Sequence, residues 1–589
     1  MSTRQLHLTI AVTVLAVAAP PYFLAPFSIT LLNYIGVYSF VALGLVLLTG
    51  VGGMVSFGQA SFMGIAAYAT AWTSALMGYS PWLGLALALV VTAAVAVAVG
   101  AVTLRLRGHF LSLSTIAWGL ALYFTFGNLQ TLGQYNGIAS VPPISIGSLE
   151  LIGSDKIYYL IWPLLLLAML ASHNLLNSRA GRAMRALRGG NVLVESLGVN
   201  AFWIKLVTFV IAALLAAISG WLYAHMSRFV SPTPFDVTMG IEFLMMAMVG
   251  GSGYLLGAVV GAALITLLKD TIQDYLPLIA PSSAGQLEIV AFSALFILFL
   301  QHAREGIVPF MIQWLPEPKH QRPAPAAPLP RRTQPTPGQT LMKVESAQRR
   351  FGGLMAVNNV SFEMRSGEIL GLIGPNGAGK STMFNLITGA LPVNGGRIIF
   401  AEKDLTNAPQ REIARAGMAR TFQHVKLRPR MTLLDNVLLG TYSRTRSGFL
   451  SGALRLDRIE ERCAQHEAMQ QLDRVGLGER AFELAGNLPL GNQRVLEIAR
   501  ALAADPILLV LDEPAAGLRQ QEKLALATLL RALRAEGLTI LLVEHDMTFV
   551  MGLVDRIVVM EFGCKLCEGE PRAVRDDPRV QEAYLGGVA

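Results

Sequence analysis

The chain has 589 residues, which is too long for one hydrophobic core and predicts two or more domains. Its hydrophobic share of 53%, its charged share of 15% and its mean hydropathy of +0.50 exclude a purely soluble globular protein. The formal net charge is +8, but much of the basic excess lies in short loops between apolar segments and in one linker. This distribution indicates a membrane topology with basic loops in the cytoplasm, so no nucleic-acid partner is expected.

Residues 1–305 are a succession of apolar runs and are expected to form a membrane domain. The runs are 6–24, 28–49, 54–78, 82–104, 110–128, 157–173, 203–222, 236–250, 253–268 and 287–301. Several reach the roughly 20 residues that a spanning helix needs. The first run, which follows Arg4, also fits a cleaved signal peptide. A retained helix is favoured because another apolar span follows at once.

Basic loops predict the orientation of these spans. They are the N-terminus with Arg4, the stretch of Arg105, Arg107 and His109, the cluster of Arg179, Arg182, Arg185 and Arg188, and the segment after Arg304. Ten crossings place all of them in the cytoplasm and the loop at 129–156 outside. Residues 240–268 are interrupted by Gly250-Gly251-Ser252-Gly253. They are expected to form two short passes or a re-entrant hairpin, because one long helix would break this parity.

Residues 306–340 are the expected cytoplasmic linker. Eight prolines lie between Pro316 and Pro337, without hydrophobic periodicity, so this segment is predicted to be a semi-rigid, extended tether that buries no core. From residue 341 to 589, patterns of buried strands alternate with helical patterns, which is typical of an α/β domain. The expected fold is a polytopic α-helical membrane domain of about ten spans joined to an α/β domain.

A phosphate-binding loop follows an apolar strand of this second half and opens a helix. Its residues are Gly374, Pro375, Asn376, Gly377, Ala378, Gly379, Lys380, Ser381 and Thr382. Glycines let backbone N–H groups wrap around phosphates, Lys380 neutralises the β- and γ-phosphate charges, and Ser381 is placed to hold Mg²⁺. The sequence therefore predicts binding of ATP with Mg²⁺.

Two later strands end in further polar groups. The apolar strand at 507–511 is followed by Asp512, which suits the Mg²⁺ shell, and Glu513, which suits orienting or deprotonating the attacking water. The next apolar strand, at 539–543, is followed by Glu544, His545 and Asp546. His545 is expected to sense the γ-phosphate. Together these residues predict an ATP hydrolase.

These elements occur in the order found in ATP-binding cassette ATPases, which the second half resembles. The resemblance implies that Phe351 stacks on the adenine and that Gln423 joins the Mg²⁺ site to the contact with a permease. It also implies that Gly491 belongs to the signature segment, residues 488–494, which completes the phosphate site of a second cassette.

The signature segment departs from the family pattern. Pro489 stands in place of a serine, Leu490 in place of the first glycine, and Asn492 in place of a glutamine, while the loop at 515–519 lacks the usual aspartate. The phosphate site that this segment completes is therefore expected to be slower or mainly structural. A heteromer with a second permease and a second ATPase is favoured over a homodimer, which would repeat the altered signature in both sites.

Within that family, the chain resembles branched-chain amino acid importers. The matching segments are 351–354, 420–423, 496–500, 512–518 and 583–586 in the ATPase half, and 58–68 and 181–200 in the permease half. The last of these resembles the coupling helix that docks onto the ATPase. The resemblance implies ATP-driven uptake of branched-chain or related hydrophobic amino acids across the bacterial inner membrane, with the ATPase in the cytoplasm and a periplasmic binding protein as partner. Importers of urea, amides or aromatic acids, and less so a homodimeric exporter, are the alternatives.

One carboxylate is expected inside the membrane domain. Glu242 lies in an apolar run, where a charge is costly and indicates a functional group. A direct role in substrate binding and a buried pair with Arg228 or Lys205 are both compatible with the sequence.

Overall fold

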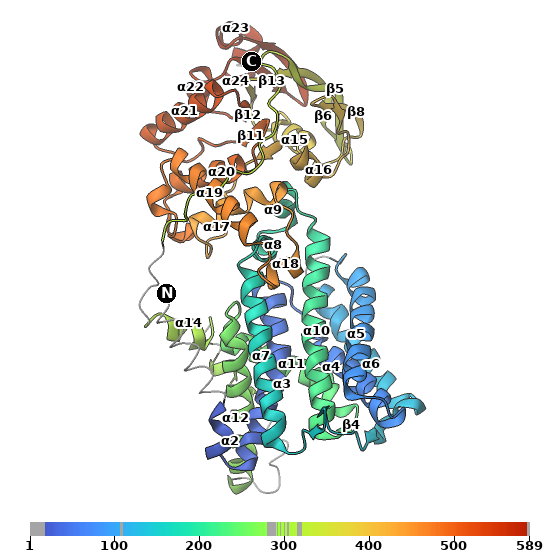
Figure 1. The fold of residues 1–589 in the computed structure, drawn as a ribbon. Helices are drawn as coiled ribbons and strands as arrows, with labels where there is room; N and C mark the ends of the chain where they lie inside the picture. Colours follow the sequence, from blue (N-terminus) through green and yellow to red (C-terminus); the bar gives the residue numbers. More distant parts are fainter. Residues whose placement is uncertain are drawn as a thin grey trace. The chain divides into compact units, whose positions relative to one another are not determined.

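The computed structural model describes residues 18–106, 110–279, 305–314 and 321–585, with short stretches between 290 and 302. The chain divides into two compact units. The membrane unit contains Met1–Leu176 and Phe202–Pro318, and the cassette unit contains Asn177–Ala201 and Lys319–Ala589. The segment at 177–201 thus lies between two membrane helices in the sequence but packs with the cassette (Figure 1).

The described part of the membrane unit is almost entirely helical. Its helices are α2 (Pro20–Phe23), α3 (Pro26–Leu45) with the π-helical η1 (Val46–Val51), α4 (Gln59–Ala71) with the π-helical η2 (Trp72–Leu76), α5 (Pro81–Thr103), α6 (Phe110–Asn128), α7 (Ser154–Leu176), α10 (Ala201–Ser227), α11 (Val237–Gly251), α12 (Leu255–Ile279) and α14 (Ile307–Ile312). Proline at N1 or N2 starts several of them, since its fixed φ suits a first turn whose N–H has no helical partner.

Six of the described helices are long and apolar enough to cross a membrane, which confirms the polytopic helical fold. They are Pro26–Val51, Pro81–Thr103, Phe110–Asn128, Ser154–Leu176, Ala201–Ser227 and Leu255–Tyr275. The expected runs at 54–78 and 236–250 form the shorter helices α4 and α11. The basic residues Arg107 and His109 and most of the run at 6–24 lie outside the described residues, and the run at 287–301 is described only in short stretches. The number of ten crossings therefore stays a prediction.

The glycine-rich interruption separates α11 from α12, so residues 240–268 do not form one long helix. Gly253 has a φ of +117°, a conformation that other residues rarely adopt. The two helices then pack backbone to backbone, because a Cβ on Gly261 would lie 1.8 Å from the Met246 carbonyl oxygen. Small residues permit this close approach between membrane helices.

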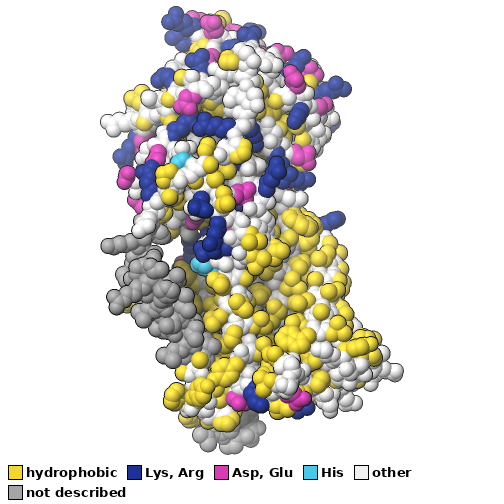
Figure 2. Space-filling view, viewed as in Figure 1, with side chains coloured by type: hydrophobic (Ala, Val, Ile, Leu, Met, Phe, Trp, Pro, Cys, Tyr) yellow, Lys and Arg dark blue, Asp and Glu magenta, His cyan; other side chains and the backbone are white. Residues whose placement is uncertain are grey.

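Hydrophobic side chains cover most of the visible face of the membrane unit, whereas Lys, Arg, Asp and Glu gather on the cassette unit (Figure 2). Exposed apolar residues such as Val90, Val102, Leu113 and Leu167 are 61% to 67% accessible. A soluble surface of this composition would aggregate, so these helices are suited to lipid.

The cassette is built on two sheets. The larger has the strand order β10-β11-β12-β7-β13-β14, in which all neighbours are parallel except the antiparallel pair β13–β14. Its strands are β10 (Met418–Arg420), β11 (Leu508–Asp512), β12 (Thr539–Val543), β7 (Ile369–Ile373), β13 (Arg556–Glu561) and β14 (Cys564–Gly569). The smaller, antiparallel sheet has the order β6-β5-β8-β9, formed by β5 (Thr340–Phe351), β6 (Leu354–Arg365), β8 (Gly395–Phe400) and β9 (Lys403–Asp404).

Helices complete the cassette. Those that frame the sites described below are α15 (Lys380–Ile387), α16 (Gln410–Ala416), α17 (Leu433–Leu438), α18 (Phe449–Ala453), α19 (Arg458–Arg474), α20 (Leu490–Leu502), α21 (Gln520–Ala535) and α22 (Met547–Met551). One apolar core lies between the two sheets, and a second lies on the other face of the larger sheet under α21 and α22. Strands β7, β11 and β12 are buried along their whole length, as their continuous apolar sequences predict.

The proline-rich linker differs from its prediction in one respect. Residues 321–336 form no helix or strand, as expected, but they pack against the cassette. Leu329 is buried in a core cluster with α17, α19 and α20, and Arg444 donates hydrogen bonds to the carbonyl oxygens of Leu329 and Pro330, each at 3.2 Å. The backbone N–H of Arg332 donates to Asp505. The linker docks through one buried leucine and through backbone carbonyl oxygens. Neither feature produces hydrophobic periodicity in the sequence.

Candidate functional site

The phosphate loop runs from β7, the strand between β12 and β13, to the first turn of α15. Ligands of open α/β sheets bind at the carboxyl ends of the strands, which is where this loop lies. Gly374, Gly377 and Gly379 have φ values of +153°, +83° and +93°. A Cβ on Gly379 would lie only 2.3 Å from the Ala356 carbonyl oxygen, so glycine is required there. The loop leaves its N–H groups and the helix N-terminus available to an anion.

Lys380 is almost entirely buried, at 7% exposure, and its ammonium lies over its own loop. Its Nζ donates to the carbonyl oxygens of Gly374 at 2.7 Å and Pro375 at 2.9 Å. Burial lowers the pKa of Lys380, while nearby Glu513 opposes that shift. Ser381 and Thr382 follow in the same first turn, so the three side chains predicted to meet the phosphates and the metal are brought together.

Asp512 ends the buried strand β11 beside this loop. Burial raises the pKa of Asp512 to about 6, and Arg420 opposes this shift. Among the described residues, no donor satisfies the buried Oδ1 of Asp512. An unsatisfied, buried carboxylate oxygen fits a cation ligand, because Mg²⁺ takes one or two protein carboxylates together with phosphate oxygens and water.

Glu513 lies between two other predicted residues, Gln423 and His545. Its Oε2 accepts a hydrogen bond from Gln423 Nε2 at 3.1 Å, and its Oε1 lies 3.8 Å from His545 Nδ1. Glu513 has a φ of +47°, a left-handed conformation that is strained for a non-glycine residue. The hydrogen bond of 2.8 Å from its N–H to the Val543 carbonyl holds that conformation. The structure therefore places Gln423, Glu513 and His545 together, and their individual roles stay predictions.

Glu544, to which sequence reasoning assigned no role, holds the backbone of this site in place. Its side chain is buried, and its two oxygens accept from the N–H groups of Ala515 at 2.7 Å and His545 at 3.1 Å. It thus fixes the loop after Glu513 and the backbone of His545 at once. Burial raises the pKa of Glu544, while these hydrogen bonds oppose the shift. An acid directly after a buried strand was the available sequence signal.

Arg420 was noticed only as part of a family segment. Its guanidinium donates to Thr388 Oγ1 at 2.7 Å and lies over the rings of Phe384, at 4.6 Å, and Phe422, at 4.8 Å. Burial lowers the pKa of Arg420 to about 10. Arg420 thus joins α15 to the segment that carries Gln423.

Phe351 and Gly491 lie on other elements. Phe351 ends β5, is 42% exposed, and has the Arg349 guanidinium 4.8 Å from its ring centre. Gly491 lies in the first turn of α20, where a Cβ would meet Glu522 Oε1 at 2.5 Å. Pro489 is the N-cap of α20 and provides no side-chain cap. The altered signature therefore does form a helix N-terminus, as its proposed role requires.

The segment at 177–201 forms α8 (Arg179–Ala186) and α9 (Asn191–Ser196) against the cassette (Figure 1). Arg182 is buried and makes a two-pronged ion pair with Glu461 of α19, at 2.8 Å and 2.9 Å. Glu461 also accepts from the N–H of Arg179 at 2.7 Å. Two parallel charged hydrogen bonds give this contact directional specificity.

Arg179 adds a second contact on the same surface. Its guanidinium lies 3.6 Å from the centre of the Tyr442 ring and donates to the carbonyl oxygens of Tyr442, at 2.9 Å, and Ser447, at 2.9 Å. At the other end of the segment, Arg415 of α16 donates to the Gly198 carbonyl at 3.1 Å. Arginines that would serve as membrane anchors by their position alone are therefore also the docking residues.

Comparisons with known proteins agree with both units. The family model described as "Branched-chain amino acid transport system / permease component" matches residues 27–300. The model described as "ABC transporter" matches residues 357–516, and "Branched-chain amino acid ATP-binding cassette transporter" matches residues 564–589.

Relatives resemble the cassette over nearly their whole length. The "High-affinity branched-chain amino acid transport ATP-binding protein LivG" of Salmonella typhimurium is 47% identical over 253 residues, which cover 42% of this chain and 98% of the relative. BraF of Pseudomonas aeruginosa, a protein of the same description, is 43% identical over 249 residues, 42% of this chain and 98% of the relative. A solved nucleotide-free ATP-binding cassette from an ABC transporter is 33% identical, with a TM-score of 0.38 over 42% of this chain and 100% of that one. The chain therefore belongs to the family of branched-chain amino acid ABC transporters and carries a permease component and an ATP-binding component in one polypeptide.

Proposed function

We propose that this chain imports branched-chain amino acids across the bacterial inner membrane and uses ATP hydrolysis in its cassette as the energy source. The observation that carries this proposal is the packing of residues 177–201, a loop of the permease sequence, within the cassette unit. A permease loop held to an ATPase by the Arg182–Glu461 ion pair and by the hydrogen bonds of Arg179 is a direct path for force from nucleotide to membrane helices. The descriptions of the relatives supply the solute class.

The nucleotide site supports a division of labour among its residues. Phe351 stacks on the adenine, the N–H groups of residues 374–379 bind phosphate, and Lys380 pairs with the β- and γ-phosphates. Ser381, Gln423 and Asp512 would hold Mg²⁺, which supplies charge neutralisation at the transferred phosphate. Glu513 orients the attacking water, and His545, 55% exposed beside it, contacts the γ-phosphate. Gly491 and its helix would serve the site of a second cassette.

Two kinds of partner follow from this proposal. The altered signature at 488–494 favours assembly with a second permease and a second ATPase. Uptake also needs a periplasmic binding protein that delivers the solute. The N-terminus, residues 179–200 and the cassette would lie in the cytoplasm, because the loop arginines favour that side.

Uptake in a deletion strain tests this function. Cells of the source bacterium that lack this chain should lose uptake of radiolabelled leucine, isoleucine and valine at low external concentrations. Wild-type chain should restore it, and the Glu513→Gln chain should not. Normal uptake of all three amino acids in the deletion strain, with loss of urea, amide or aromatic-acid uptake instead, would contradict the proposed solute.

A further inference from the structure

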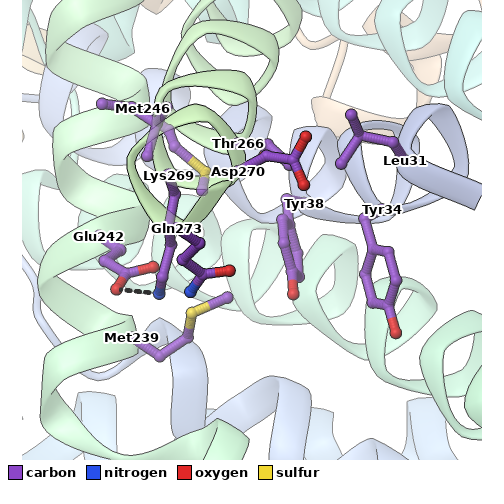
Figure 3. A pocket seen from close by; sticks show the side chains of 11 residues that line it. Leu31, Tyr34, Tyr38, Met239, Glu242, Met246, Thr266, Lys269, Asp270 and Gln273 are labelled. Carbon is purple, nitrogen blue, oxygen red and sulfur yellow. Dashed lines mark hydrogen bonds and ion pairs between the residues drawn. The ribbon is translucent and has the colours of Figure 1, made fainter. Parts of the chain in front are cut away.

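A polar pocket lies among the apolar helices of the membrane unit, between α3, α11 and α12 (Figure 3). Its cavity has a volume of about 210 Å³. This is below the ~300–1,000 Å³ used by drug-sized ligands, so the pocket suits a smaller molecule. It contains Glu242, the carboxylate that the sequence indicates as a functional group.

Glu242 pairs with Lys269 of α12, a partner that sequence reasoning did not consider. Lys269 Nζ lies 2.8 Å from Glu242 Oε1. Arg228, one of the partners expected from the sequence, instead donates from its Nε to the Val141 carbonyl at 3.3 Å. The ion pair thus joins α11 to α12 on the wall of the cavity.

This ion pair is open to the cavity instead of being sealed in the helix packing. The Glu242 side chain is 14% exposed and the Lys269 side chain is 41% exposed. Charges between membrane helices are costly, and structural pairs are normally closed off and satisfied by further hydrogen bonds. An exposed pair leaves both charged groups accessible to a ligand.

We infer that this pocket binds the charged head of an amino acid, with the ligand carboxylate on Lys269 and the ligand ammonium on Glu242. This inference rests on the proposed function. A zwitterion inserted between the two side chains replaces each charge partner, so no charge is left unpaired. A ligand with only one charge would leave Lys269 or Glu242 without a partner, which is costly between membrane helices.

The remaining lining fits the rest of such a ligand. Met239 and Met246 of α11 face the same cavity, and methionine adapts its shape to aliphatic groups of different branching. Figure 3 shows the Gln273 amide beside the ion pair, and the ring of Tyr38 on the opposite side of the pocket. The apolar and polar walls therefore match an aliphatic side chain and a charged head.

Asp270 also lines the pocket, so its charge must be counted. Its carboxylate is turned toward Leu31, away from the Glu242–Lys269 pair (Figure 3). With Glu242 and Asp270 against Lys269, acids outnumber the base in this lining. This balance disfavours a simple anion and strengthens the preference for a ligand that carries an ammonium group.

Equilibrium binding tests this site without the binding protein. The full chain, in lipid nanodiscs with the subunits that copurify, is titrated with radiolabelled leucine, with isoamylamine, which lacks the carboxylate, and with isocaproate, which lacks the ammonium. Leucine should bind at least about tenfold more tightly than either analogue. Lys269→Gln should weaken leucine binding about tenfold, because leucine loses a charged contact. Isoamylamine should bind as tightly as before or more tightly, because the variant has no Lys269 charge to leave unpaired. Glu242→Gln should likewise weaken leucine binding and leave isocaproate binding unchanged or tighter.

The controls separate this role from a structural one. Asp274→Asn removes a charge from the same helix outside the pocket and should change nothing. The double variant Glu242→Gln with Lys269→Gln leaves no unpaired charge, so it should remain monodisperse and bind ATP while losing leucine binding.

Equal weakening of leucine and isoamylamine binding by Lys269→Gln overturns the inference. If cells take up leucine through this chain and the wild-type pocket shows no preference for the zwitterion, this inference fails while the proposed function stands. If cells take up no leucine through this chain, both the inference and the proposed function are wrong.

Discussion

At the scale of single residues, the nucleotide site separates groups that hold phosphate from groups that act on water. Lys380 is buried in the phosphate loop, whereas Glu513 is held in a strained conformation between Gln423 and His545. Their chemistry differs accordingly, since a lysine neutralises bound charge in the ground state and a carboxylate acts when water attacks.

Substitution of these two residues should therefore have different effects. Lys380→Ala should weaken ATP binding at least about tenfold, because it removes a charged contact to phosphate. Glu513→Gln should leave ATP affinity unchanged and lower turnover about 100-fold or more, the range expected for loss of a general base. Titration with a fluorescent ATP analogue and a phosphate-release assay measure the two quantities. Glu479→Gln, on the exposed surface, serves as the control, and equal loss of affinity in both variants would refute the assigned roles.

The residues that sequence reasoning found all lie in local patterns. A glycine-rich loop after a buried strand, or an acid at the end of one, can be recognised within about ten residues of sequence. The missed residues act through partners far away in the chain. Glu544 binds the backbone of Ala515, and Lys269, the missed partner, pairs with Glu242 of the preceding helix. No periodicity or spacing encodes which of several bases an acid will meet, so these pairs required the structure.

At the scale of elements, α8 is one of the two helices of the permease sequence that contact the ATPase. Its ion pair between Arg182 and Glu461 is buried on the arginine side, at 4% exposure. Removal of one partner of a buried pair is expensive because the other charge stays behind without compensation.

Variants of this pair should uncouple ATP hydrolysis from transport. Arg182→Ala and Glu461→Ala should each weaken docking by ~3 kcal/mol, about 100-fold in the docking equilibrium. Transport should fall, while ATP binding to the cassette persists. The double variant should be less harmful than the sum of the single variants, since it leaves no unpaired charge. Transport and ATPase rates of the reconstituted complex measure this, with Arg188→Ala, an exposed arginine of the same segment, as the control. Additive losses would show that the pair does not couple the two halves.

The linker is a second docked element: it is extended, as predicted, but it buries Leu329, which the prediction of a tether without a core did not include. Proline-rich composition indicated an extended chain, which residues 321–336 are, but composition says nothing about what an extended chain lies against. The donor to its carbonyl oxygens, Arg444, comes more than a hundred residues later and also pairs with buried Glu467 at 3.3 Å.

Exposure of this linker to protease tests its docking. Leu329→Asp places a charge in the core cluster that Leu329 fills, so it should release the linker and speed tryptic cleavage at Arg331 and Arg332 by about tenfold or more. Ala327→Asp, at an exposed position two residues earlier, should leave the cleavage rate unchanged. Identical rates for both variants and wild type would show that the linker is already free in solution.

At the scale of the whole transporter, the altered signature predicts asymmetry between two nucleotide sites. Pro489 caps α20 without a hydroxyl and without a backbone N–H. In a heteromer, the phosphate loop of this chain meets the signature of a second ATPase, and only the other site receives Pro489.

The reconstituted complex should respond unequally to changes in its two sites. Glu513→Gln should abolish transport, whereas Pro489→Ser should be tolerated or raise ATPase activity, because serine restores a hydroxyl and is a favoured N-cap worth about 1 kcal/mol. Transport and ATPase assays on the same preparation compare the two variants. A stable homodimer of this chain alone, with full transport stimulated by a binding protein, would disprove the heteromer.

Because the segments at 177–201 and 321–336 belong to the same chain as the membrane helices, dissociation has a different consequence for this cassette. In transporters with separate subunits, a weakened contact lets the ATPase diffuse away. Here a cassette that dissociates from α8 stays covalently linked to it. Its effective concentration near α8 is then in the millimolar range for short connections. Rebinding is then a first-order event that does not depend on how much transporter the cell makes. The fused chain therefore keeps a fixed one-to-one ratio of permease to ATPase, and it tolerates a weaker contact at α8 than two separate subunits would.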